Sequence, residues 1–569
     1  MAGIAGWAVP ARRALDENAL VPMLERLLHR NGDAEILLGY SDRPRDQQVA
    51  FGATLCDPAS GIALVLDGAI DNAADLRAQL AKKGFAFGKS VTDTKLQDRC
   101  LSPISEVLLR AYQYWDKDVV KQLSGAFAFA LWDPRKGRLM LARDRFGEKP
   151  LYVEERAGGL FFASEAKALL AAPGARAEVD TAALRACIAH GYVCGPQTLF
   201  RGVRKLAPAT YAMWQFGRLH ETRYWIAPDR NPPAGRLAGD AVEGFTSHLH
   251  ESVKSRECAS VLLSGGIDSA VLVAVVAKEG RQVKTFSLGF EGDKRSELGP
   301  AAAVAKHFGT AHHEIVVRPA ELLPQLASLV AAHDGPVVPS VLALNRLAVE
   351  ARRGAATVLS GDGCDEVVGG YRKLLAERFH PGFCRSLEQR GEKQAAQLLP
   401  GEKPGERVSD ADPANTHLRK ALYADQTGRL PDQLLERDDR AGAAHGVRIA
   451  LPYLDHRLAE FVSGLPDDQR VRGMATKWVL REAARQLVPA GLARRKAGFR
   501  MPIRDWLRND LRDTLAEHLQ GGGSRTRRYY DAAVLDRLVR EHLDGKNNYD
   551  ATLWTLLNLE TWHRRYNPA

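Results

Sequence analysis

A turn rich in glycine and serine carries the clearest chemical signal in this sequence. Its residues, Ser264-Gly265-Gly266-Ile267-Asp268-Ser269, follow the apolar run 261–263 and precede the helix-like run 270–277. Glycine permits positive φ and close backbone approach, and the free N–H groups of a first helical turn attract an anion. A carboxylate beside a bare phosphate would repel it, so Asp268 indicates a Mg²⁺ ion between the two. The turn predicts a metal-assisted phosphate site, and the alternative is an ordinary strand–helix turn.

A second turn of the same kind follows the apolar residues Val358 and Leu359. It reads Ser360-Gly361-Asp362-Gly363-Cys364-Asp365-Glu366. Parallel α/β sheets bind ligands outside the carboxyl ends of their strands, so we expect both turns at one edge of a sheet. Two carboxylates on separate loops, Asp268 and Asp365, are what a clamp for Mg²⁺ and pyrophosphate requires.

Composition narrows the class of protein. The chain has 569 residues, 45% of them hydrophobic and 26% charged, as in an ordinary soluble globular protein of more than one domain. The net charge of +10 is spread thinly without interleaved aromatics, which favours anionic small molecules over nucleic acid. The seven scattered cysteines form no CxxC pair, which indicates reduced thiols rather than disulfides or a zinc site. Without a signal peptide or a long apolar run, we expect a cytoplasmic protein.

The pattern of predicted strands and helices changes near the middle of the chain, which predicts two domains. Residues 1–220 contain short alternating runs such as 126–132, punctuated by hairpin-like spacers, and predict stacked antiparallel sheets with a few helices. The proline-containing stretch 227–234 lies in a predicted linker, residues 221–240. From 241 to 569, short strands alternate with longer helices and give way to a helical C-terminus, which is typical of a parallel α/β domain.

Several longer motifs occur in an order that resembles asparagine synthetase over most of the chain. They lie at residues 125–133, 142–152, 163–167, 264–269, 359–366, 369–371, 452–456, 476–477 and 498–499. The chain is therefore similar to the asparagine synthetase family, in which a class II glutamine amidotransferase domain precedes an ATP-pyrophosphatase domain. The resemblance implies an α+β first domain with the stacked sheets of Ntn hydrolases. It also implies an α/β second domain that adenylates a carboxylate.

The resemblance assigns roles to individual residues of the second domain. It implies an ATP site made by Leu262, Ser264, Gly265, Gly266, Asp268, Ser269, Leu288, Ser360 and Gly361. Asp268 and Asp365 would hold Mg²⁺, and Asp362 occupies the position of an acidic residue important for acyl-adenylate chemistry. Lys477 matches the lysine that contacts the phosphates and stabilises the charge developing as the adenylate forms. A solvated helix lysine is the alternative for Lys477.

The first domain departs from the family at the nucleophile and in three motifs that serve glutamine hydrolysis. The nucleophilic cysteine is replaced by Ala2, which cannot attack glutamine. The glutamine-binding Arg-Gly-Pro-Asp reads Arg30-Asn-Gly-Asp33, the oxyanion-hole Asn-Gly-Glu reads Asp67-Gly68-Ala69, and Asp-Thr-Glu reads Ile104-Ser105-Glu106. A carboxylate at Asp67 would repel a developing oxyanion. These changes predict a naturally inactive glutaminase, and an engineered change at Ala2 alone is the alternative.

The same loss occurs in β-lactam and carbapenam synthetases, which keep the domain as a scaffold. Those enzymes carry a tyrosine where this chain has Asp362, which argues against membership of that branch.

The predicted pocket for the carboxylate substrate differs as well. Family members carry Glu-x-Arg just before Pro-Phe-Leu-Asp, and here these positions are Arg448-Ile449-Ala450. Losing an arginine that can bind a carboxylate through two hydrogen bonds is not a conservative change. We therefore expect Glu366, Arg448 and Ala450 to line a pocket for an acid bulkier than aspartate. The alternative is a surface arginine beside a packed alanine.

These observations predict an AMP-forming amide synthetase that uses ATP and Mg²⁺ to join a small carboxylic acid to ammonia or an amine, without hydrolysing glutamine. The alternatives are a glutamine-dependent asparagine synthetase changed at residue 2, a non-catalytic scaffold, and a lactam-forming or macrocyclising enzyme. Neither nucleic acid nor a membrane is expected as a partner, and a homodimer is left open. The identity of the acid and of the amine does not follow from the sequence.

Overall fold

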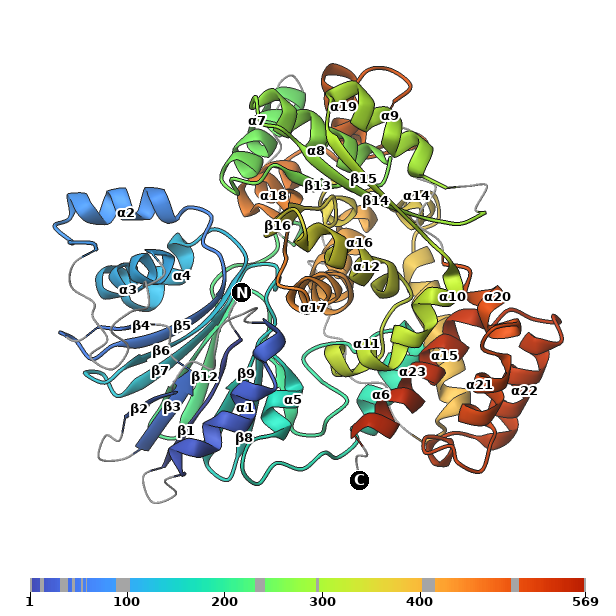
Figure 1. Cartoon of the computed structure of the whole chain (residues 1–569), viewed down its shortest axis with the longest axis horizontal. Helices are drawn as coiled ribbons and strands as arrows, with labels where there is room; N and C mark the ends of the chain where they lie inside the picture. The colour runs from blue at the N-terminus through green and yellow to red at the C-terminus, as the bar shows by residue number, and fades with distance from the viewer. Residues whose placement is uncertain are drawn as a thin grey trace. The chain divides into compact units, whose positions relative to one another are not determined.

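The computed structural model describes residues 3–10, 15–30, 39–42, 47–52, 55–57, 59–88, 103–230, 241–292, 296–401, 415–492 and 501–566. The chain divides into two compact units (Figure 1). Unit 1 comprises Met1–Arg176, Gly195–Ala227 and Ala443–Arg448, and unit 2 comprises Ala177–Cys194, Pro228–Gly442 and Ile449–Ala569. Within the described ranges, no helix is both long and apolar enough to cross a membrane.

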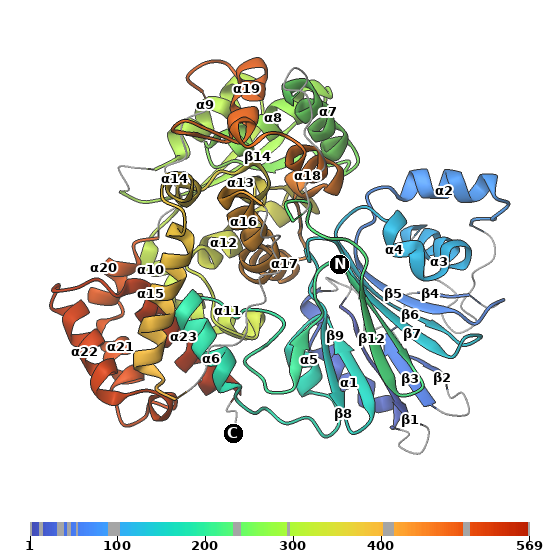
Figure 2. The same ribbon diagram turned by 180° about the vertical axis from the view of Figure 1, so that it is seen from behind.

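Unit 1 contains two antiparallel sheets (Figure 2). The first has the strand order β10 (Val203–Lys205), β8 (Tyr152–Arg156), β9 (Gly159–Ala163), β1 (Ala5–Pro10), β3 (Gln47–Gly52) and β2 (Gly39–Asp42). The second has the order β12 (Arg218–Arg223), β11 (Thr210–Gln215), β7 (Arg138–Arg143), β6 (Phe127–Asp133), β5 (Ala63–Gly68) and β4 (Leu55–Cys56). The stacked antiparallel sheets predicted for the first domain are confirmed.

Alternating side chains of β6 explain how unit 1 forms two hydrophobic layers. Successive side chains of a strand face opposite sides of its sheet. Ala128 and Ala130 lie in the layer that the two sheets share, whereas Phe127 and Phe129 lie in the layer beneath the helices. The helices of this unit are α1 (Val21–Glu25), α2 (Ala73–Lys82), α3 (Pro103–Trp115), α4 (Val119–Gln122) and α5 (Ala166–Leu170).

Unit 2 is built on a sheet that brings the two predicted turns together. Its strand order is β15 (Ala311–Val317), β14 (Lys284–Phe290), β13 (Ser260–Leu262), β16 (Thr357–Leu359) and β17 (Arg448–Ala450). The pairs β15–β14, β14–β13 and β13–β16 are parallel. The turns follow the carboxyl ends of the neighbouring strands β13 and β16, and they lead into α8 (Ile267–Lys278) and α13 (Cys364–Val368). The parallel sheet predicted for the second domain is confirmed.

Helices make up most of the remainder of unit 2, including its C-terminal part, as predicted. They are α6 (Thr181–His190), α7 (Ala241–Lys254), α9 (Leu298–Phe308), α10 (Pro319–Leu322), α11 (Leu326–His333), α12 (Ser340–Arg352), α14 (Arg372–Phe379), α15 (Phe383–Leu398), α16 (His417–Ala424), the π-helix Asp425–Leu435, α17 (Glu436–Ala443), α18 (His456–Ser463), α19 (Trp478–Leu487), α20 (Ile503–Arg508), α21 (Arg512–Leu519), α22 (Ala532–Leu543) and α23 (Asp550–Tyr566). A small hairpin, β18 (Val471–Arg472) and β19 (Ala475–Thr476), precedes α19.

Helix α6 belongs to unit 2 although it comes from the first half of the chain. It packs against α15 and α23. Nε2 of His190 lies 3.2 Å from Oε1 of Glu392, and a Cβ on Gly391 would lie 2.2 Å from the carbonyl oxygen of Ala189. Glycine at position 391 therefore permits the close approach of α6 and α15. The two units consequently interleave along the sequence.

Candidate active site

The ammonium group of Lys477 lies between two carboxylates that come from the two predicted turns. Its Nζ atom is 2.7 Å from both carboxylate oxygens of Asp268 and 2.5 Å from Oδ1 of Asp365. Asp268 is in the first turn of α8, Asp365 is in the first turn of α13, and Lys477 immediately precedes α19. The structure thus brings together three residues that the sequence analysis assigned to one site.

Burial and charge act on Lys477 in opposite directions. The residue is 4% exposed, so it is not a solvated surface lysine. Burial alone would lower the pKa of its ammonium group, but the nearby acidic groups, Asp268 foremost, outweigh burial and raise that pKa. Lys477 therefore stays charged. Two carboxylates around one ammonium leave an excess negative charge that suits a divalent cation.

The backbone around Lys477 leaves no room for a side chain at position 370. Lys477 has a left-handed φ of 54°, and its N–H donates to the carbonyl oxygen of Gly369 at 3.2 Å. A Cβ on Gly370 would lie 1.8 Å from Oδ1 of Asp365 and 2.0 Å from Cε of Lys477. Glycine at this position is required because the two charged side chains meet directly against its Cα.

The first turn is tightened by its own hydroxyl groups. The Oγ atom of Ser269 accepts from the N–H of Ser264 at 3.1 Å and donates to the carbonyl oxygen of Gly266 at 3.2 Å. Gly265 has a φ of 73°, and a Cβ there would lie 2.9 Å from the carbonyl oxygen of Glu297. Ser264 is exposed, whereas the residues after it are buried. The turn is compact and presents its beginning to solvent, as a phosphate-binding loop must.

The second turn packs directly on the first. A Cβ on Gly361 would lie 3.0 Å from Cβ of Asp268, so the two loops touch at this glycine. Leu262 ends β13 and pairs with Phe286 of β14, which places Leu288 at the same end of the neighbouring strand. The residues predicted to surround ATP therefore cluster at one edge of the sheet.

Asp362 is held by a residue that the sequence analysis missed. Its Oδ2 atom accepts from Oγ of Ser360 at 2.9 Å and from Nη2 of Arg437 at 2.8 Å. Nη2 of Arg437 also lies 2.7 Å from Oδ1 of Asp438, which is 2% exposed. Burial raises the pKa of Asp438 to about 8, although the charge of Arg437 acts the other way. Residues 436–440 are all charged, and such a run normally indicates a solvated face, so no motif indicated this contact.

Glu366 lies in a buried contact with a tyrosine. The hydroxyl group of Tyr371 donates to Oε1 of Glu366 at 2.5 Å. Burial, reinforced by the charge of Asp365, raises the pKa of Glu366 to about 7. The guanidinium of Arg429 lies 5.0 Å from the centre of the Tyr371 ring, a cation–π contact. This part of the site combines a titratable acid, an aromatic ring and a cation.

Arg448 and Ala450, the other predicted pocket residues, have different surroundings. Ala450 is 1% exposed, and its carbonyl oxygen accepts from the N–H of Ser360 at 2.9 Å, which places it beside the second turn. Arg448 is the one residue of β17 that belongs to unit 1, and its Nη2 atom lies 2.8 Å from Oδ1 of Asp71 in the same unit. The role of both residues in choosing a substrate stays a prediction.

Two residues of the glutamine-binding motifs, Arg30 and Asp67, belong to a buried charge network in unit 1. Arg30 is 0% exposed, and its guanidinium donates to Oδ2 of Asp67 at 2.7 Å and to Oε1 of Glu165 at 2.9 Å. Gly68 has a φ of 104°, and Ile104 lies in the first turn of α3. Ala2 lies outside the described residues. The charge of Arg30 is therefore matched by two carboxylates of its own chain.

Comparison with known proteins assigns the chain to a family. The asparagine synthase model matches residues 244–564, and the glutamine amidotransferase domain model matches residues 1–225. The chain belongs to the asparagine synthase family. A putative glutamine-hydrolysing asparagine synthetase of Mycobacterium bovis is 31% identical, over 88% of this chain and 84% of that protein. Asparagine synthetase 1 of Bacillus subtilis, also named as glutamine-hydrolysing, is 28% identical over 98% of this chain and 96% of that protein.

Membership of the asparagine synthase family identifies the chain as an ATP-dependent carbon–nitrogen ligase. Among solved structures, a glutamine phosphoribosylpyrophosphate amidotransferase from Bacillus subtilis covers 63% of this chain and 81% of its own, with 15% identity and a TM-score of 0.26. The fold class is assigned from the strand orders of the two sheets in unit 1 and of the parallel sheet in unit 2.

The donor set suits Mg²⁺ bound together with a phosphate ligand. Among the residues that the structure describes, no three His, Cys, Asp or Glu side chains form a metal cage. Asp268 and Asp365 supply two carboxylates, and Mg²⁺ usually takes one or two carboxylates together with phosphate oxygens and water. The residues of this asparagine synthase family member therefore fit a metal that arrives with its phosphates.

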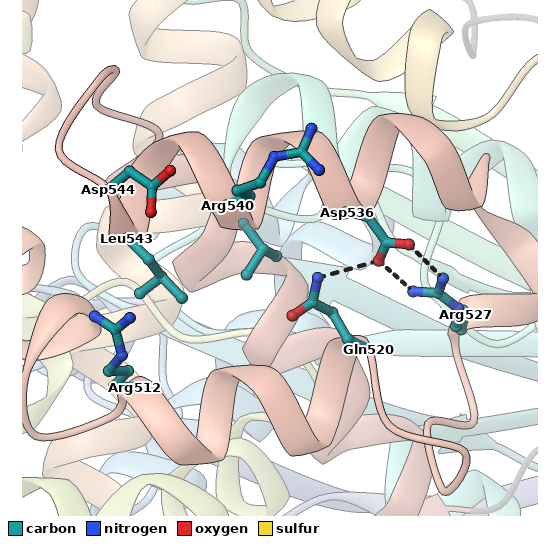
Figure 3. Close-up of a pocket in the computed structure, with 8 residues that line it drawn as sticks. Arg512, Gln520, Arg527, Asp536, Arg540, Leu543 and Asp544 are labelled. Carbon is teal, nitrogen blue, oxygen red and sulfur yellow. Dashed lines mark hydrogen bonds and ion pairs between the residues drawn. The ribbon is translucent and has the colours of Figure 1, made fainter.

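The C-terminal helices contain a cavity with a different set of lining residues (Figure 3). It measures about 540 Å³ and is lined by Arg512, Gln520, Arg527, Asp536, Val539, Arg540, Leu543 and Asp544. The guanidinium of Arg527 binds both oxygens of Asp536 at 2.7 Å, and Gln520 donates to the same carboxylate at 3.2 Å. None of the predicted site residues lines this cavity.

We expect Gly370→Ala to disrupt the site, because its methyl group would displace Asp365 or Lys477. Overpacking of this kind costs about 1–3 kcal/mol of folding free energy. Calorimetric binding of pyrophosphate with Mg²⁺ and the thermal unfolding midpoint measure the two effects. Gly299→Ala is the matched control, because a Cβ there meets nothing within 4 Å. Unchanged pyrophosphate affinity in Gly370→Ala would show that the close packing is dispensable.

Proposed function

We propose that this chain is an AMP-forming amide synthetase that works without hydrolysing glutamine. It adenylates a carboxylic acid with ATP and transfers the acyl group to ammonia or an amine. The observation that supports this proposal most strongly is the buried contact of Lys477 with Asp268 and Asp365. This contact joins two phosphate-type turns and a permanent positive charge at the carboxyl end of a parallel sheet, where such sheets bind nucleotides.

In the first step, a carboxylate oxygen of the substrate attacks the α-phosphorus of ATP, and pyrophosphate leaves with the electrons of the broken P–O bond. The N–H groups at the start of α8 face the phosphate oxygens. Lys477 turns from the carboxylates to the phosphates, where its ammonium group offsets the charge that develops on pyrophosphate. Asp268 and Asp365 would hold Mg²⁺, which would supply further positive charge to the pyrophosphate.

In the second step, the nitrogen nucleophile attacks the acyl carbon of the adenylate, AMP leaves, and the nitrogen gives up a proton. Asp362 is suited to accept this proton, because its side chain is 31% exposed while Ser360 and Arg437 fix its orientation. A positioned carboxylate within reach of the nucleophile is the usual requirement for such a proton transfer.

The contacts of Arg30 support the loss of glutamine hydrolysis. In a working glutaminase, the matching arginine holds the carboxylate of glutamine. Here two carboxylates, Asp67 and Glu165, already occupy the guanidinium of Arg30 in a buried network. A glutamine carboxylate would have to compete with both in a region of low dielectric constant. With alanine in place of the nucleophile at residue 2, the first domain lacks both a free arginine for the glutamine carboxylate and a nucleophile to attack the glutamine amide.

The second candidate function is a glutamine-dependent asparagine synthetase that carries a changed residue 2. The names of the relatives from Mycobacterium bovis and Bacillus subtilis favour it, because both are described as glutamine-hydrolysing. A non-catalytic scaffold is the third, and any turnover of ATP would exclude it.

Replacing Asp365 with alanine should lower pyrophosphate release by about 100-fold, as expected when a group that orients the metal and phosphates is lost. Release is measured with ATP and the carboxylic acid that a substrate screen identifies. Asp536→Ala is the matched control, since this carboxylate belongs to the cavity in the C-terminal helices and pairs with Arg527. A loss of only a few-fold in a folded Asp365→Ala variant would contradict the metal-clamp role.

Glutamine should not serve as the nitrogen donor, even after Ala2→Cys. The thiol would return, but Asp67 and Glu165 would still neutralise Arg30. Glutamate release from glutamine measures the activity, and ammonia in the same assay with ATP is the control for a working synthetase unit. Robust glutamate release by this single variant would contradict the proposal and support a glutamine-dependent asparagine synthetase with a changed residue 2.

Aspartate should be a poor substrate, because Arg448 and Ala450 replace the acid and the arginine of the family motif. Mass spectrometry of products from ATP, ammonia and a panel of acids tests this expectation. An acid bulkier than aspartate should give the amide and AMP at least about tenfold faster, the effect of about 1.4 kcal/mol of differential binding. Efficient formation of asparagine would instead assign the chain the activity for which its relatives are named.

A further inference from the structure

We infer that Asp229 is a positioning residue for the adenylation site and acts through Arg470 and Gln426. The inference rests on the proposed function, because the groups that it positions are Lys477 and Asp365. Asp229 lies between the two family matches, the first of which ends at residue 225 while the second begins at residue 244. A residue of the connecting segment therefore contributes to the site.

Asp229 and Arg470 form a buried pair with two hydrogen bonds. Oδ1 of Asp229 lies 2.5 Å from Nη1 of Arg470, and Oδ2 lies 2.8 Å from Nη2. Both residues are 0% exposed. The planar guanidinium group matches a carboxylate at two points, so the pair fixes orientation as well as distance. The carboxylate of Asp229 therefore sets the plane of the Arg470 side chain.

Two side chains bound to Asp229 hold the C-terminal end of α13. Nη2 of Arg470 donates to the carbonyl oxygen of Val367 at 2.5 Å. Nε2 of Gln426 lies 2.8 Å from Oδ2 of Asp229 and donates to the carbonyl oxygen of Glu366 at 3.0 Å. A helix of five residues has few internal partners for its last carbonyl groups. Asp229 thus orients Arg470 and Gln426, which donate to the C-terminal end of α13. Asp365 lies in the first turn of this helix.

Arg470 also positions Lys477 through the backbone. Its carbonyl oxygen accepts from the N–H of Trp478 at 2.9 Å. The antiparallel strands β18 and β19 lie between these two residues and pair Val471 with Thr476. On its other side, Lys477 donates its N–H to Gly369, the residue that follows α13. Lys477 is therefore held between the hairpin and the end of the helix that carries Asp365.

Removing the charge of Asp229 should displace both Lys477 and Asp365. Arg470 would become a buried cation without its bidentate partner, and it would no longer have a fixed orientation toward Val367. A displacement of about 1 Å in catalytic groups can cost about 100-fold in rate. The site would then bind pyrophosphate weakly, although the protein remains folded.

Calorimetric titration of the full chain with pyrophosphate in the presence of Mg²⁺ tests the inference without knowledge of the carboxylic acid. Asp229→Asn should weaken the affinity about 10–100-fold, the range typical of residues that orient metal ligands. Glu560→Gln is the matched control, because Glu560 is also a buried carboxylate of unit 2 and accepts from Arg525 and Thr526. The control should destabilise the fold and leave pyrophosphate affinity unchanged.

A purely structural role is separated from positioning by the double variant Asp229→Asn with Arg470→Met. This variant removes the unpaired buried cation, so its unfolding midpoint should recover. Its pyrophosphate affinity should remain low, because the contact with Val367 is still missing. If Asp229→Asn does not fold, the pyrophosphate affinity is measured instead in the double variant and in Gln426→Leu, and both should bind pyrophosphate weakly.

The outcomes separate this inference from the proposed function. Wild-type pyrophosphate affinity in folded Asp229→Asn, or recovery of affinity together with stability in the double variant, would overturn the positioning role. The variant Lys477→Ala tests the site itself. If the wild type and Lys477→Ala bind Mg²⁺ and pyrophosphate equally, the adenylation site is wrong and the role of Asp229 falls with it.

Discussion

The burial of one ammonium group constrains the geometry of unit 2. A charge removed from water is tolerated only when opposite charges approach it closely, and Lys477 obtains them from Asp268 and Asp365. Three chain segments must therefore converge within hydrogen-bond distance. The left-handed backbone of Lys477 and the absence of a side chain at Gly370 are consequences of this convergence. The parallel sheet supplies the framework, since its neighbouring strands end at the same edge.

The same electrostatic principle has the opposite result in unit 1. Around Arg30, carboxylates and cations of the chain satisfy one another, as Lys167 pairs with Glu165 and Lys149 lies 3.6 Å from Asp67. In unit 2, two carboxylates contact the single ammonium group of Lys477, and the net negative charge suits a divalent metal ion bound with phosphates. The contacts around Arg30 combine three cations, Arg30, Lys149 and Lys167, with two carboxylates, whereas those around Lys477 combine two carboxylates with one cation.

The two turns and the fold class could be predicted from the sequence because their signals are local. Glycines, hydroxyl groups and an acid within a few residues specify a phosphate-type turn, and alternating strands and helices specify a parallel sheet. Arg437 and Asp229 could not be found in this way, because they meet their partners across 75 and 241 residues. Arg448 illustrates the same limit, since its ion pair with Asp71 spans 377 residues and no motif indicates it.

The interleaving of the two units bears on how such a protein can evolve. Helix α6 is encoded within the amidotransferase-like half, yet it packs against α15 and α23 of the synthetase unit. A deletion that removed the first half of the gene would also remove this helix and expose the apolar and charged surface that it covers. The loss of the first half as a block would therefore cost unit 2 one of its packed helices, whereas point substitutions in the first half leave that packing intact.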